Sequence, residues 1–205
     1  MNKKLGLYSA VAVTATIILF AAAMLRGSNY ISYFVSMLLS WEYILLICSF
    51  LTEITGERKA LAYGSLAFAC LYGVFINLVY FTQLTTVANQ TASSDALQVL
   101  SFESLGSLMF NFDLYGYGMM AISTCLIGIA MKPANKTDQW LKALLIIHGI
   151  FAPASVLLPM LNVFNSGSGE GGDFIGTLVL FLWCAYFTPI GILSFMHFKL
   201  KVREF

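Results

Sequence analysis

Charged residues are scarce in this chain, and their scarcity is the first constraint on what the protein can be. Only 10% of the 205 residues are Asp, Glu, Lys or Arg, whereas about 25% are charged in a soluble globular domain. Hydrophobic residues reach 59% and the mean hydropathy is +0.82, so a soluble particle of this size could not bury its apolar surface. The composition excludes a disordered chain, a disulfide-rich secreted domain, a nucleic-acid binder and an ordinary cytosolic enzyme.

Motifs for nucleotide, metal and hydrolytic chemistry are also missing. The chain has no Gly-rich phosphate loop ending in Lys-Ser/Thr, no Gly-x-Ser-x-Gly, no His-Glu-x-x-His and no Asn-Pro-Ala. The cysteines form no Cys-x-x-Cys pair and have no clustered histidines beside them. We therefore predict no cofactor and no metal site, and we interpret the cysteines as packing residues.

Long apolar runs are the main feature that is present. A hydrocarbon core about 30 Å thick needs roughly 20 apolar residues in a helix that rises about 1.5 Å per residue. Such a segment must be helical, because an unpaired backbone amide in lipid costs several kcal/mol and no alternating barrel-strand pattern occurs here. The sequence predicts a single all-α domain over residues 1–205, a polytopic bundle of six transmembrane helices. The predicted helices are residues 5–25, 31–51, 60–81, 105–131, 140–161 and 176–198.

Basic residues are distributed unevenly between the connections, and this predicts the orientation. With a cytoplasmic N-terminus, all of the 11 lysines and arginines except Arg26 fall on the cytoplasmic side. The two longer outer segments, 82–104 and 162–175, contain acids and no base. We therefore predict that both termini are cytoplasmic, with the helices in a lipid bilayer of the cell membrane.

Two segments need separate interpretation. Run 5–25 follows Lys3 and Lys4 and ends in alanines, as a cleaved signal peptide does, but it exceeds the usual apolar length of roughly 7–15 residues. Cleavage would leave five helices. In segment 82–104, leucines at near-helical spacing follow a possible cap at Ser94, which predicts a short helix on the outer surface.

Four polar or ionisable side chains lie inside consecutive apolar runs, where a charge costs about 2.5–3.5 kcal/mol on insertion scales. They are the candidates for ligand or ion binding: Glu42, Asn77, Asp113 and His148. The two runs that contain these acids, 31–51 and 105–131, have no lysine or arginine. We interpret Glu42 as a buried proton or cation site, Asp113 as an acid in the outer half, and His148 and Asn77 as orienting groups. The alternative for Asn77 and His148 is packing and hydrogen bonding between helices.

Three further residues are candidates for lining the same cavity. Trp41 and Tyr117 are aromatic residues at mid-depth, and Thr188 precedes Pro189, whose missing N–H allows a kink. Core packing and interhelical hydrogen bonding are the alternative roles. Tyr80, near the end of its run, fits the aromatic belt at the membrane surface.

Parts of the third to fifth runs resemble a pattern in uncharacterised bacterial six-helix integral membrane proteins. The pattern comprises residues 80–85 and 112–117, Trp140, and His148-Gly149. The resemblance implies a bacterial inner-membrane protein and carries no activity, substrate or site residue. In size alone, the bundle is similar to the substrate-binding subunits of energy-coupling vitamin transporters.

Three classes of function stay open at this point. The first is binding or transport of a small solute, ion or lipophilic molecule through an outward-facing polar cavity formed by the second to fifth helices. The second is a non-transporting accessory subunit, sensor or immunity-type protein that contacts a partner membrane protein, for which the basic segment 199–203 is suited. The third is a lipid-modifying membrane enzyme.

Overall fold

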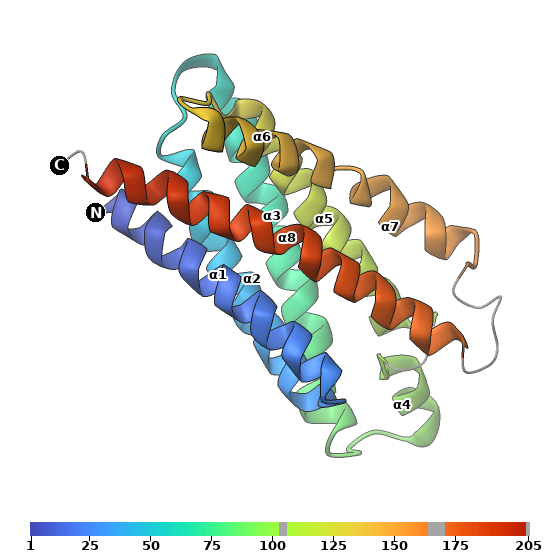
Figure 1. Cartoon of the computed structure of the whole chain (residues 1–205). Helices are drawn as coiled ribbons and strands as arrows, with labels where there is room; N and C mark the ends of the chain where they lie inside the picture. The colour runs from blue at the N-terminus through green and yellow to red at the C-terminus, as the bar shows by residue number, and fades with distance from the viewer. Residues whose placement is uncertain (103–105, 164–170, 204–205) are drawn as a thin grey trace.

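The computed structural model describes residues 1–102, 106–163 and 171–203, and every regular element in these ranges is a helix (Figure 1). The prediction of an all-α fold is therefore confirmed. The elements are α1 (Asn2–Leu25), α2 (Asn29–Leu51), the 3-10 turn η1 (Gly56–Arg58), α3 (Lys59–Thr82), the π-helical turn η2 (Gln83–Val87), α4 (Ser94–Leu100), α5 (Leu108–Ala130), α6 (Lys136–His148), α7 (Phe151–Met160) and α8 (Gly171–Arg203).

Six helical segments are long and apolar enough to cross a membrane, which agrees with the number of spans predicted from the sequence. Their apolar character suggests a multi-pass protein in a lipid bilayer. The segments are Asn2–Leu25, Asn29–Leu51, Gly56–Val87, Leu108–Ala130, Lys136–Met160 and Leu178–Val202.

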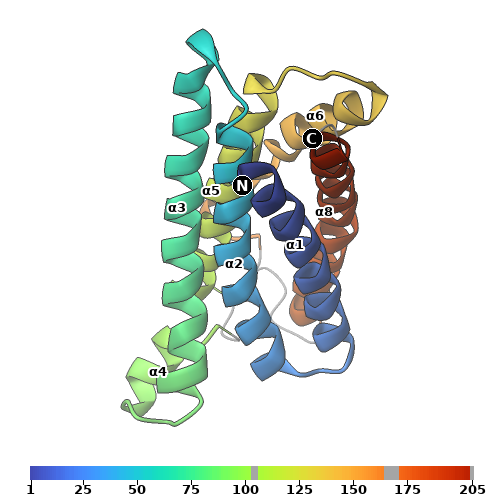
Figure 2. The ribbon, with the colours of Figure 1, turned by 90° about the vertical axis from the view of Figure 1, so that its left-hand side faces the viewer.

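The helices form a bundle in which α5 contacts α2, α3, α4, α6 and α7. Helix α1 packs against α2 and α8, α3 packs against α2 and α5, and α6 packs against α5 and α8. Both termini lie at one end of the bundle, together with the α2–α3 and α5–α6 connections (Figures 1 and 2). We call this the terminal end. Helix α5 starts at the opposite end and runs toward it.

The fifth predicted helix, 140–161, is in fact two helices that are separated at Gly149 and Ile150. Pro153 has no N–H, so it cannot donate the α-helical hydrogen bond to the Gly149 carbonyl. The Ala152 N–H donates to that carbonyl instead, at 3.1 Å, which is the tighter spacing of a 3-10 turn. The proline therefore ends α6 and starts α7 rather than kinking one continuous helix.

The short helix predicted in segment 82–104 is present as α4, at the end of the bundle opposite to the termini (Figure 1). It begins at Ser94, but the capping residue is Ser93, and no side-chain hydrogen bond caps it. Gln83 fixes this segment to the end of α3, because its Nε2 donates to the Leu100 carbonyl and its Oε1 accepts from the Phe102 N–H, both at 2.9 Å. The buried amide replaces a cap as the restraint on α4.

Small residues let α5 approach α6 and α7 closely. A Cβ atom added at Gly128 would lie 2.9 Å from Leu145 Cβ of α6, and one added at Gly118 would lie 2.2 Å from Ser155 Oγ of α7. Helices in a membrane associate through such close contacts, because lipid removes most of the hydrophobic driving force between them.

Replacing Gly128 by Ala should destabilise the bundle by about 1–3 kcal/mol, because overpacking displaces its neighbours. The new methyl group would lie 3.1 Å from the backbone nitrogen of Ile146, which cannot move aside as a side-chain tip can. Thermal unfolding in detergent measures the effect. Gly64→Ala is the matched control, because its methyl group meets only Leu126 Cδ1 at 3.4 Å. Its melting temperature should stay level or rise, and equal losses in both variants would contradict the close packing of α5 on α6.

Candidate functional site

The four predicted candidate residues contact different neighbours and do not form one cluster. Glu42 of α2 is half-buried beside α1, where the Thr16 hydroxyl is 3.0 Å from Glu42 Oε2. This contact gives the carboxyl a polar partner from the neighbouring helix.

Asn77 joins α3 to α2 through a complete set of hydrogen bonds. Its Nδ2 donates to the Gly73 carbonyl at 2.7 Å and to Ser40 Oγ at 2.8 Å. Its Oδ1 accepts from Trp41 Nε1 at 2.9 Å. Trp41 itself is 50% exposed on the outside of the bundle. These contacts match the interhelical role that the sequence left open for Asn77.

His148 is fully buried between α5 and α8, and both of its ring nitrogens are occupied. Trp183 Nε1 can only donate, so His148 Nε2 accepts this bond, at 3.2 Å. The Thr124 hydroxyl donates to the Ala121 carbonyl at 2.9 Å, which leaves its oxygen to accept from His148 Nδ1 at 2.7 Å. The contacts are those of a neutral imidazole with its proton on Nδ1. Thr188, the predicted neighbour on α8, donates to the Cys184 carbonyl of its own helix at 2.7 Å.

Asp113 is the candidate whose polar atoms are not all satisfied. It is 3% exposed on the inward face of α5, and its Oδ1 has no hydrogen-bond partner among the described residues. The side chain of Tyr80 interacts with the carboxyl, and Tyr72 and Tyr117 lie within its electrostatic reach. The hydroxyls of Tyr72 and Tyr117 are also buried without a partner among these residues. We call these four side chains the Asp113 cluster.

Tyr80 differs from its predicted place in the surface belt. It is 1% exposed, and its ring stacks on Tyr33 with centroids 5.3 Å apart. The position of a residue near the end of an apolar run gives its depth but not the face of the helix on which it lies, and Tyr80 lies on the inner face.

A second polar cluster, which the sequence analysis missed, lies at the terminal end. His197 of α8 has its Nδ1 2.7 Å from Asp138 Oδ1 and its Nε2 2.9 Å from Glu53 Oε2. Lys201 forms an ion pair with the same Glu53 oxygen. Asp138 is 1% exposed, and its Oδ2 accepts from the Ala134 N–H at 3.0 Å. We call Glu53, Asp138, His197 and Lys201 the terminal network.

The two contacts of the His197 ring need two hydrogen atoms, whereas a neutral imidazole carries only one. Each ring nitrogen of His197 faces a carboxyl oxygen, and each of these two contacts needs a hydrogen atom between nitrogen and oxygen. Two acids and two bases then give an electrically neutral group. Burial alone would raise the pKa of Glu53, but the bonds to His197 and Lys201 outweigh burial and hold its pKa below the ordinary 4.5.

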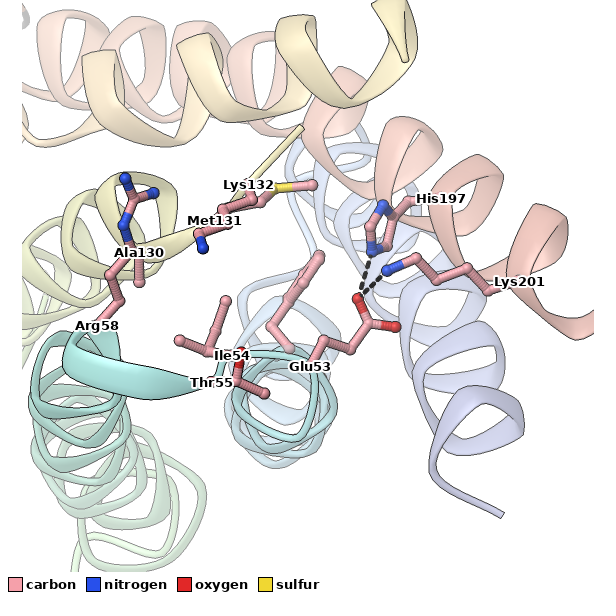
Figure 3. Close-up of a pocket in the computed structure, with 10 residues that line it drawn as sticks. Glu53, Ile54, Thr55, Arg58, Ala130, Met131, Lys132, His197 and Lys201 are labelled. Atoms are coloured by element: carbon pink, nitrogen blue, oxygen red, sulfur yellow. Dashed lines mark hydrogen bonds and ion pairs between the residues drawn. The ribbon is translucent and has the colours of Figure 1, made fainter. Parts of the chain in front are cut away.

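A pocket opens beside this network (Figure 3). In the described parts of the chain, no group of three His, Cys, Asp or Glu side chains is arranged to hold a metal ion. The pocket is lined by residues from the α2–α3 connection, the end of α5, the α5–α6 connection and α8: Phe50, Glu53, Ile54, Thr55, Arg58, Ala130, Met131, Lys132, His197 and Lys201.

Sequence spacing gives no signal for the terminal network. Asp138 and Glu53 are 59 and 144 residues from His197 along the chain, and each lies where a polar residue is ordinary.

Comparison with protein-family models, with curated proteins and with solved structures finds no match. The resemblance to bacterial six-helix proteins therefore stays a prediction.

Replacing Glu53 by Gln should lower the stability at pH 7 by about 1–2 kcal/mol, because it removes a charged partner from His197 and Lys201. The pKa of Glu53 is lower in the folded state, so its contribution is complete above pH 4.5 and is lost as the pH falls through the folded value. Melting temperatures of the two proteins should therefore converge below pH 4.5. Glu57→Gln, at an exposed position in η1, is the control and should match the unchanged protein throughout. A constant gap between the two proteins down to pH 3 would contradict the ionised network.

Proposed function

We propose that this chain is a multi-pass membrane protein that binds and moves a small solute or ion, with Asp113 as its buried proton or cation site. The observation that carries the proposal is the carboxyl of Asp113, 3% exposed and with Oδ1 unpaired among the described residues. Acids inside a membrane bundle are costly, and they mark ion pathways and proton relays more often than packing sites.

The surroundings of Asp113 favour a small cationic occupant. No ion pair involving this carboxyl occurs in the described parts of the chain, so a proton or a metal cation is needed to offset its charge. The hydroxyls of Tyr72 and Tyr117 have no partner in the described structure. Each offers both an acceptor and a donor, which suits a hydrated proton or a partly dehydrated monovalent cation.

A succession of aromatic and hydrogen-bonded contacts leads from Asp113 toward the middle of the bundle, which supports movement rather than static binding. Tyr117 lies one helical turn further along α5 and packs edge-on against Trp183, with ring centroids 5.0 Å apart. Trp183 donates to His148, which contacts Thr124. Since Thr124 is eleven residues beyond Asp113, the succession covers roughly 16 Å of the α5 axis.

The unequal distribution of basic residues supports an orientation in which the terminal end faces the cytoplasm of a bacterial cell. Asp113 lies near the start of α5, at the other end of the bundle. The proposed site is therefore in the outward half of the protein, as the first class of function requires.

Asp113, rather than Glu42, is the primary site in this proposal. Glu42 is only half-buried and has Thr16 as a hydrogen-bond partner. Asn77 and His148 have their polar atoms occupied by other side chains and backbone, so we assign them to positioning of the helices. Trp41 and Thr188 have equivalent packing roles.

Contact with a partner membrane protein is the second candidate function, and α7 is the observation that favours it. None of its residues is buried, and its principal contact within the bundle is α5. Purification in mild detergent separates the two functions. A stoichiometric protein that co-purifies, and that leaves when polar residues replace the exposed Leu157 and Met160 of α7, would favour the partner role.

Replacing Asp113 by Asn should abolish ion movement, because the amide keeps the shape of the side chain but cannot exchange a proton or neutralise a cation. The measurement uses dye-filled proteoliposomes with an imposed proton or sodium gradient. We expect the unchanged protein to dissipate at least one of the gradients and Asp113→Asn to slow this by about tenfold or more, as loss of an essential proton-transfer group does.

Glu42→Gln is the matched control, since it neutralises the other acid of the apolar runs and keeps an oxygen for Thr16. Its rate should stay within about twofold of the unchanged protein. Equal rates for the unchanged protein and Asp113→Asn would exclude Asp113 as the site, and a loss confined to Glu42→Gln would transfer that role to Glu42.

A further inference from the structure

We propose that the pocket at the terminal end binds a phosphate group, held by Arg58 and Lys132 and presented either by a phospholipid headgroup or by a soluble phosphate ester. This site is separate from the Asp113 cluster. It is formed where the α2–α3 connection, the α5–α6 connection and α8 converge, and Asp113 contributes nothing to it.

Basic side chains from three segments of the chain line this pocket. Arg58 comes from η1, Lys132 from the connection after α5, and Lys201 from α8. Figure 3 shows Arg58 and Lys132 on one side of the pocket and the Glu53–His197–Lys201 contacts on the other. Glu53 is the only acid among the described lining residues, so three bases against one acid leave a net charge of +2 before any proton on His197 is counted.

Acids of the protein do not neutralise the two bases that carry the proposal. Neither Arg58 nor Lys132 forms an ion pair in the described structure. Glu53 is already paired with Lys201 and His197, and Asp138 with His197 and a backbone N–H. Arg58 and Lys132 therefore keep their full charge for a ligand.

The arrangement favours phosphate over a smaller or singly coordinated anion. A guanidinium group donates two parallel hydrogen bonds to oxygens of one anion, whereas a lysine ammonium contributes a point charge. Bases that approach from different segments are best matched by an anion with oxygens on several sides. Thr55 also lines the pocket, and its hydroxyl can donate to a further phosphate oxygen.

Apolar residues beside these bases allow the phosphate to carry a glycerol or acyl substituent. Ile54, Met131 and Phe50 are buried and contribute to the same lining. Phospholipids present this combination, with an anionic head above an apolar body, and basic pockets between membrane helices bind such headgroups. A soluble phosphate ester offers the same head without the acyl chains, so the two sources need separate tests.

Melting temperatures of the purified full-length protein in dodecyl maltoside test the site. The lipid probes are phosphatidylglycerol and diacylglycerol, which lacks the phosphate. The soluble probes are glycerol 3-phosphate and inorganic phosphate, each compared with sodium chloride at equal ionic strength. A ligand at about a hundredfold excess over its dissociation constant should raise the melting temperature of the unchanged protein by about 5 °C or more.

Two double variants separate a site from general attraction to positive charge. Arg58→Ala with Lys132→Ala removes the proposed contacts, and both side chains are exposed, so the ligand-free protein should remain folded. Lys4→Ala with Lys136→Ala removes the same charge from exposed positions outside the pocket. We expect the first pair to lose at least half of the ligand-induced shift and the second pair to keep it.

The probes then identify the source of the phosphate. A shift with phosphatidylglycerol alone assigns the site to a lipid headgroup, and a shift with glycerol 3-phosphate or inorganic phosphate assigns it to a soluble ester. Equal losses in the two double variants, or no shift beyond the diacylglycerol and chloride controls, would overturn the proposal. Native mass spectrometry of the unchanged protein, with bound phospholipid counted before and after excess inorganic phosphate, decides independently if the Arg58–Lys132 variant does not fold.

Discussion

A polar group that enters the apolar interior of this bundle has to find its partner there, because lipid provides none. Most of the polar side chains obey this constraint through bonds to their own helix or to the next one. Thr124 and Thr188 donate to carbonyls of the preceding turn, and Tyr43 donates to Ser123 across the gap between α2 and α5 at 2.8 Å. The positions of the helices follow from these pairings together with the close contacts at glycines.

The same constraint separates polar groups that have hydrogen-bond partners within the bundle from those that do not. Asn77 and His148 use their donors and acceptors within the bundle, so they hold helices together and have little left for a ligand. Asp113, Tyr72 and Tyr117 keep buried polar atoms without partners among the described residues. An unsatisfied buried polar atom costs about 1–3 kcal/mol, and a bound proton, water or cation would offset that cost. Asp113 therefore differs from the other candidates in having a buried oxygen without a hydrogen-bond partner among the described residues.

Much of the fold follows from the sequence, because length and hydropathy are local properties. The all-α class, the number of apolar segments and the short helix α4 could be predicted in this way. The division at Gly149 could not, because Pro153 allows either a kink or a break and neighbouring helices decide between them. For the site, the apolar run around Asp113 identified the acid, but its tyrosine neighbours on α3 are far away in sequence. The cluster of Glu53, Asp138 and His197 could not be predicted, because these residues are far apart in the sequence and only the packing of the helices brings them together.

Helix α8 takes part in polar contacts at two depths, and their energies differ. Near its middle Trp183 makes one neutral hydrogen bond to His148, of a kind that contributes about 1 kcal/mol. Near its end His197 and Lys201 belong to a charged network, in which each hydrogen bond to a charged group contributes about 1.5–3 kcal/mol. Pro189 lies between the two contacts and already lacks one backbone hydrogen bond. For the proposed movement of a solute, this difference predicts that Trp183 separates from His148 first and that α8 bends at Pro189, while the terminal network holds the other end in place.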